Sequence, residues 1–198
     1  MPGGVNLQQR HLIGKSLVRM AQELYLPAAT WQIFSSASAH ATSSSLYMKV
    51  GGADLHVQTI AASSTTCDMV FDAAFTAPLD SSTSGSVIPF VECLVSTNLA
   101  TTGSGLGFQL NYNYINVAAC STTAGSVTGT VTNSSGSLGV GGRLSGSLSA
   151  MPSFAAGGQL VSLQMRGLTG ACTAGANVDF AGLRLRYIAD KTGASTTS

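Results

Sequence analysis

Charge is what this sequence lacks most. Only 9% of its 198 residues are charged, whereas an average soluble domain has about a quarter of its residues charged. The 9 basic and 8 acidic side chains leave a net charge of +1, which provides no basic face for nucleic acid and little self-repulsion to keep the chain soluble. A surface of small hydroxyl and methyl groups is suited to being covered by neighbouring molecules. The composition therefore predicts a building block of an assembly rather than an enzyme.

Long apolar runs are missing as well. No stretch approaches the roughly 18 residues that a membrane span requires, and the opening residues have neither the basic nor the hydrophobic region of a signal peptide. We therefore expect no membrane insertion and no secretion. The hydrophobic content of 44% is close to the globular average, so the chain has enough apolar residues for one domain with a core.

The cysteines follow no metal-binding pattern. All four lie far apart in the sequence: Cys67, Cys93, Cys120 and Cys172. Zinc sites need closely spaced pairs, so we predict no metal site, and no other cofactor motif is present. Without a secretion signal, a reducing compartment is the default. We expect the cysteines to be small buried hydrophobic residues, with one or two disulfides as the alternative.

One segment, residues 6–25, has helical periodicity. Four apolar side chains recur at intervals of three and four residues: Ile13, Leu17, Met20 and Leu24. Three basic side chains accompany this stripe: Arg10, Lys15 and Arg19. Such charges more often form a solvated face than a phosphate contact. We predict an N-terminal helical arm over residues 1–29. Its stripe is expected to dock on its own domain, a sister subunit or a larger scaffold, because so short a helix is unstable alone.

After Pro27 the periodicity changes to two, which is typical of strands. Phe108 to Val117 is the clearest example. The segment from Val87 to Val95 is apolar on both faces, as a central strand would be, so Glu92 needs a partner there. Pro89 argues instead for an edge or a bulge. Roughly nine or ten such segments with turn signals between them predict an antiparallel sandwich or barrel over residues 30–190. Residues 191–198 are expected to form a polar tail.

Few side chains suggest catalysis. His56 and Asp54 share a strand face, an arrangement that fits a solvated pair better than half of a triad or a metal site. Asp68 and Asp72 lie four residues apart on one face. Paired carboxylates can hydrolyse glycosides or bind calcium, but ordinary surface carboxylates are the simpler interpretation. We therefore expect the protein not to be an enzyme.

Aromatic residues raise the possibility of sugar binding, because the face of a pyranose ring is apolar. Tyr112 and Tyr114, however, share the strand face of Phe108 and Leu110, which is the expected core face. Trp31, just after the predicted arm, is expected to anchor packing.

The chain as a whole resembles the jelly-roll decoration (cement) and fibre-type structural proteins of tailed bacteriophages. The features that carry the resemblance are the short N-terminal arm, the charge-poor strands rich in Gly, Ser and Thr, and the amphipathic ending from Phe180 to Asp190. The resemblance implies a mainly β fold, an antiparallel sandwich of jelly-roll type. It also implies a homotrimer on a virion assembled in the host cytoplasm, with the arm gripping the major capsid protein.

On this resemblance the expected function is capsid decoration, which stabilises the phage head. The expected docking residues are those of the arm: Arg10, Ile13, Lys15, Leu17, Arg19, Met20 and Leu24. The alternative is a tail-fibre or receptor-binding domain that binds a glycan. A secreted carbohydrate-binding module and a glycosidase are further rivals, the first requiring a secretion signal and the second a convergent carboxylate pair.

Overall fold

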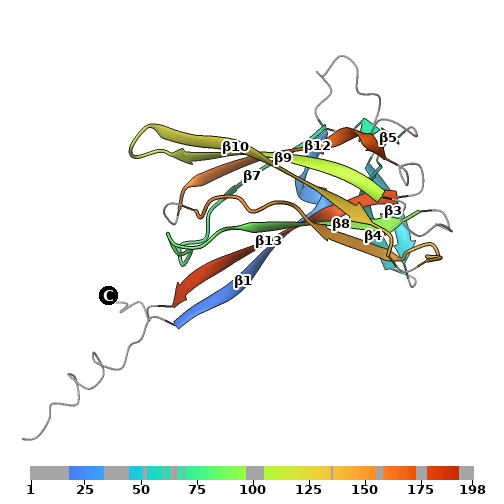
Figure 1. Ribbon diagram of the computed structural model, residues 1–198, viewed down its shortest axis with the longest axis horizontal. Coiled ribbons are helices and arrows are strands. Elements are labelled where there is room, and N and C mark those ends of the chain that lie inside the picture. The colour runs from blue at the N-terminus through green and yellow to red at the C-terminus, as the bar shows by residue number, and fades with distance from the viewer. Residues whose placement is uncertain are drawn as a thin grey trace, which may run out of the picture.

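The computed structural model describes residues 18–33, 45–50, 53–59, 61–62, 67–68, 70–96, 105–134, 136–154, 158–172 and 178–191. Their regular secondary structure is almost entirely β, and most of it lies in two antiparallel sheets packed face to face (Figure 1). The one helical element among the described residues is a short 3-10 turn, η1 (Ala28–Thr30). None of the described helical structure is long and apolar enough to span a membrane. The predicted β-sandwich is confirmed.

Within the described residues, eight strands build the sandwich. In chain order they are β1 (Val18–Pro27), β7 (Val70–Thr76), β8 (Ile88–Val95), β9 (Gly105–Asn116), β10 (Ser121–Thr132), β11 (Arg143–Ser147), β12 (Leu160–Cys172) and β13 (Val178–Lys191). Sheet A runs in the order β11-β8-β13-β1 and sheet B in the order β10-β9-β12-β7. Counted along the chain, these are strands 6-3-8-1 and 5-4-7-2. This is the strand order of a jelly roll.

The remaining described strands flank these eight. β2 (Gln32–Ile33) pairs with β7 in sheet B. A hairpin of β3 (Ser45–Val50) and β4 (Ala53–Thr59) joins sheet A at the start of β13. β5 (Ala61–Ala62) and β6 (Cys67–Asp68) pair with each other. The hairpin places Val57 against Leu94 and Ala181, in a small apolar cluster separate from the main core.

Alternating side chains of the two sheets meet in an aromatic core. The ring of Phe180 stacks on Phe71, with 5.3 Å between the ring centroids, and meets the edge of Trp31 at 5.5 Å. Tyr114 is also buried, and its hydroxyl donates to the Pro152 carbonyl at 3.0 Å. Trp31 Nε1 donates to the Leu26 carbonyl at 3.2 Å. The predicted core role of Tyr114 and the anchoring role of Trp31 are confirmed.

Residues 18–27 form a strand and not the predicted helix. β1 pairs with β13 along its whole length, from Val18 opposite Lys191 to Pro27 opposite Gly182. A strand also satisfies the apolar pattern, because Leu24 and Leu26 then share the face that packs on the core. Tertiary pairing with an amphipathic partner overrides the local helical signal. The predicted helical arm is therefore wrong over residues 18–27, and residues 1–17 lie outside the described part.

Two other boundaries change as well. Lys191 is the last residue of β13, so it belongs to the sandwich, and residues 192–198 lie outside the described part. β8 is a central strand between β11 and β13, so the inference of an edge from Pro89 is wrong. Pro89 lies near the start of β8, beyond the last register pair with β11, and its carbonyl accepts the Leu148 N–H at 2.9 Å. A missing proline N–H is tolerated at such a strand start.

Candidate functional site

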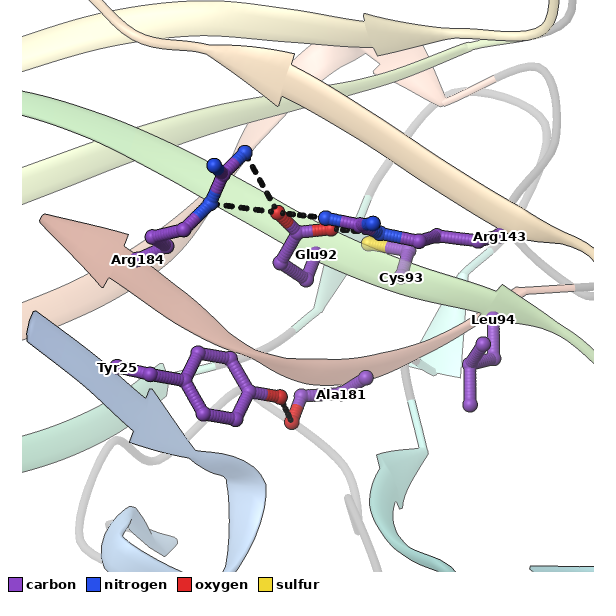
Figure 2. A pocket seen from close by; sticks show the side chains of 7 residues that line it. All are labelled: Tyr25, Glu92, Cys93, Leu94, Arg143, Ala181 and Arg184. Atoms are coloured by element: carbon purple, nitrogen blue, oxygen red, sulfur yellow. Dashed lines mark hydrogen bonds and ion pairs between the residues drawn. The ribbon is translucent and has the colours of Figure 1, made fainter. Parts of the chain in front are cut away.

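A shallow pocket lies on the outer face of sheet A, and four strands of that sheet, β1, β8, β11 and β13, contribute to it (Figure 2). Its lining residues are Tyr25 from β1, Glu92, Cys93 and Leu94 from β8, Arg143 from β11, and Ala181 and Arg184 from β13. The pocket exists because the jelly-roll order places the first, third, sixth and last strands side by side. Most of the lining is apolar, and the charged groups gather on one side of it.

Glu92 is the charged centre of this site. Its side chain is only 6% exposed. The carboxylate accepts Nε and Nη2 of Arg143 at 2.6 and 2.7 Å, the Ser145 hydroxyl at 3.1 Å and Nε of Arg184 at 3.2 Å. A buried carboxylate is tolerated only with such partners, and the sequence prediction that Glu92 needs one is confirmed. The hydrogen bonds from Arg143 to Glu92 raise the pKa of Arg143.

The ion pairs continue from Glu92 across β13 to β1. Nη1 of Arg184 donates to both carboxylate oxygens of Glu23, at 2.9 and 3.0 Å, and Nε of Arg186 donates to the same carboxylate at 3.2 Å. The Arg184 hydrogen bond lowers the pKa of Glu23 despite partial desolvation. Both guanidinium groups lie over the Phe90 ring, at 4.7 and 5.0 Å from its centre. Three cations and two carboxylates thus largely neutralise one another on this face.

Tyr25 forms the opposite rim of the pocket. Its side chain is half exposed, and its hydroxyl donates to the Ala181 carbonyl at 3.1 Å. Burial of the ring raises its pKa, as does the charge of Glu92. The rim depends on a bulge in β13 between Phe180 and Gly182. A Cβ at Gly182 would lie 2.6 Å from the Leu26 carbonyl oxygen, so the close approach of β1 requires glycine there.

Neither the thiol nor the carboxylate that lines this pocket is free to act as a nucleophile. Cys93 is fully buried, and burial together with the nearby charges of Glu92 and Asp179 raises the pKa of its thiol, which keeps it protonated and unreactive. Glu92 is held by two guanidinium groups. The side chain of Arg143 is 62% exposed, so its guanidinium N–H groups that do not bond to Glu92 can face a ligand. Among the described residues, no cluster of His, Cys, Asp and Glu could hold a metal ion.

The predicted docking residues do not come together on one helical face. Leu24 packs against the core from the inner face of β1, so in the structure it contacts the chain's own sandwich. Met20 lies on the same side but is partly exposed, while Arg19 faces outward and pairs with Asp190 at 3.3 Å. The other predicted docking residues lie outside the described part: Arg10, Ile13, Lys15 and Leu17.

The remaining candidates are dispersed. Asp72 is half-buried in β7 opposite Gln32, whereas the side chains of Asp54, His56 and Asp68 lie outside the described part. Cys93 is buried and free, as expected. Cys120 is also free but exposed, contrary to expectation, because it lies in the turn between β9 and β10 with a left-handed φ of 48°. The side chains of Cys67 and Cys172 lie outside the described residues.

The strand order and this site define the class of the molecule, a jelly-roll β-sandwich with an ion-paired outer face. Comparison with protein-family models and with curated proteins finds no match. Among solved structures, the chain is similar to the CBM22-1 and GH10 modules of xylanase 10B from Clostridium thermocellum, complexed with xylohexaose. The identity is 9% and the TM-score 0.39 over 84% of this chain and 28% of that one. It is also similar to dimeric latent PorU from Porphyromonas gingivalis, with 14% identity and a TM-score of 0.33 over 80% of this chain and 14% of that one.

Proposed function

We propose that this chain is a non-catalytic structural subunit of a virion, a capsid decoration protein that associates with its own copies and binds the major capsid protein. The observation that supports this role best is the distribution of charge. The outer face of sheet A carries ions that pair with one another, and no charged residue occurs between Glu92 and Arg143 in the sequence. Covering a large surface without unpaired charges costs little free energy of desolvation.

The shell contact is assigned to the segment that precedes β1. Val18 pairs with Lys191, so residues 1–17 are joined to the sandwich beside the end of β13. They contain the predicted docking residues Arg10, Ile13, Lys15 and Leu17 and no acidic residue. This combination fits an apolar surface with an acidic rim, and repetition of the segment in each copy of a symmetric assembly would multiply a weak contact.

Deletion of residues 1–17, which leaves β1 intact, tests the proposal. We expect the shortened chain to retain its circular dichroism and melting temperature but to lose cosedimentation with shells of the major capsid protein from the same virus. Deletion of residues 192–198 is the control, because this segment leaves from the same end of sheet A but carries no predicted docking residue. Undiminished binding of the chain that lacks residues 1–17 would contradict the assigned contact.

A glycan-binding role is the second candidate, and the half-exposed Tyr25 beside Arg143 favours it. An aromatic ring and a guanidinium group suit the apolar face and the hydroxyls of a sugar. We expect any glycan signal on an array to disappear in Tyr25→Ala and to persist in Tyr25→Phe, which keeps the ring. An array on which the intact chain binds nothing would remove this candidate.

A further inference from the structure

β10 is an edge of sheet B, and half of its outer side has no partner among the described residues. It pairs with β9 from Ser121 opposite Asn116 to Thr132 opposite Gly105, and the order of sheet B ends with it (Figure 1). Near the end of β10, Gly129 bridges Leu148, and the Ser149 N–H donates to the Thr128 carbonyl at 2.9 Å. Within the described part, no such contact reaches residues 121–127.

The position of Thr128 shows which main-chain groups point outward. Its carbonyl is directed away from β9, and the directions of N–H and C=O repeat at every second residue of a strand. Ser126, Ala124 and Thr122 therefore direct their N–H and C=O groups away from the sheet as well. All three residues are exposed. A row of unpaired donors and acceptors is a template for another strand.

This edge has none of the usual protection against pairing. Soluble proteins block such edges with lysine, proline, a bulge or a covering segment. β10 contains no charged residue and no proline, and its register with β9 is unbroken. The outer edge of sheet A differs, because β1 carries Arg19 and Glu23. The turn that precedes β10 is uncharged as well, and Val117 is exposed in it.

We propose that the first half of β10 pairs antiparallel with the same segment of a second copy, through Thr122, Ala124 and Ser126, so that two B sheets become continuous. A second copy is the occupant that the charges favour. Pairing about a two-fold axis places a segment opposite the same segment of the second copy. Any charged side chain in it would then face its own like charge, which opposes pairing. The first half of β10 has no charged side chain. This inference rests on the self-association in the proposed function and names its surface.

The mass of the full chain in solution tests the pairing. Ala124→Lys places two cations at the two-fold contact, and Ala124→Pro removes an outward N–H that the isolated sheet does not use. We expect an even number of chains in the wild-type assembly and about ten-fold weaker association in both variants. At a concentration near the wild-type Kd, the average mass of the variants should therefore fall toward half that of the paired assembly. Ser162→Lys is the matched control, because it adds the same charge to the exposed face of the central strand β12. It should leave the mass unchanged.

Hydrogen exchange supplies a second readout that does not depend on a variant. The amides of Thr122, Ala124 and Ser126 should become protected as the concentration rises. A monomer at high concentration, or an assembly that both Ala124 variants leave intact, would overturn the pairing. Shell binding through residues 1–17 is measured separately. An odd-numbered assembly that binds shells would therefore refute the edge contact alone, and a paired assembly that ignores shells would refute the decoration role alone.

Discussion

Arg143 on β11 binds Glu92 on β8 diagonally across the two strands. The residue directly opposite Glu92 in the register is Ser145. The two donors of its guanidinium group lie 2.6 and 2.7 Å from the two carboxylate oxygens. The pair is asymmetric, because Glu92 is buried and Arg143 is largely exposed. Most of the free-energy cost of desolvation therefore falls on the Glu92 carboxylate. We accordingly expect changes at Glu92 and at Arg143 to affect stability unequally.

Glu92→Gln should lower the free energy of unfolding by about 2 kcal/mol, because the charge-assisted bonds to Arg143 and Arg184 lose their anion. Arg143→Gln should cost less, about 1 kcal/mol, because Arg184 still pairs with Glu92 and Arg143 is partly solvated already. Urea unfolding of both single variants and the double variant gives the coupling energy. Equal losses for the two single variants would contradict the asymmetry.

Much of the sandwich could be predicted from local patterns. Alternation from Phe108 to Val117 places Tyr114 in the core, where the structure has it, because a period of two leaves no choice of face once one face is apolar. Glu92, a lone charge in a strand that is apolar on both faces, shows in the same way that a buried partner must exist. These inferences depend only on neighbours in the sequence.

The site and β1 could not be predicted in this way. Met20 and Leu24 are four residues apart, and this spacing puts them on one face of a helix and also on one face of a strand. Residues 18–27 form a strand because they pair with β13, which lies at the other end of the chain. The pocket draws on four strands whose order no spacing reveals. Tyr25 in particular is brought to Ala181 only by the bulge before Gly182. The exposed edge at β10 does have a signal in the sequence, namely the long uncharged stretch that contains this strand.

Asp179 should make stability depend on pH. Its side chain is buried, Oδ2 has no hydrogen-bond partner among the described residues, and burial raises its pKa despite a hydrogen bond from Ser96. Below the ordinary carboxyl range, both the folded and the unfolded states are protonated and Asp179 has no effect. As the pH rises through that range toward the raised pKa, the unfolded state ionises first, and the folded state loses stability.

Asp179→Asn removes this ionisation. The variant should therefore be more stable than the wild type near neutral pH, and the difference should shrink as the pH falls toward about 3. Denaturant unfolding at several pH values measures this, with Asp72→Asn on sheet B as the control. An advantage that grows on acidification would have the wrong sign for a raised pKa.

The two free cysteines of the described part should react very differently. Cys120 is exposed in the β9–β10 turn, whereas Cys93 is buried with a raised thiol pKa. A thiol reagent should modify Cys120 in the folded protein, and Cys93 only on unfolding, at least about a hundred-fold more slowly. Peptide mass spectrometry follows each site, and Cys120→Ser should abolish the fast modification at that position. Rapid modification of Cys93 would show that β8 is not packed as described.

The strand assignment of β1 predicts a sharp boundary for truncation. A chain that begins at Val18 keeps every register pair with β13 and should melt like the wild type. A chain that begins at Ala28 loses those pairs and the buried Leu26, and it exposes the edge of β13. It should lose cooperative unfolding and bind a hydrophobic dye.

Gly182→Ala probes the same contact with a single methyl group. Because the new Cβ would meet the Leu26 carbonyl oxygen at 2.6 Å, either β1 must move away or the bulge must change. We expect a loss of about 2 kcal/mol in the free energy of unfolding. A helical arm that merely precedes the sandwich would predict the opposite result in both experiments. The chain that begins at Ala28 would then unfold cooperatively at the wild-type temperature, and the added methyl group would have no effect.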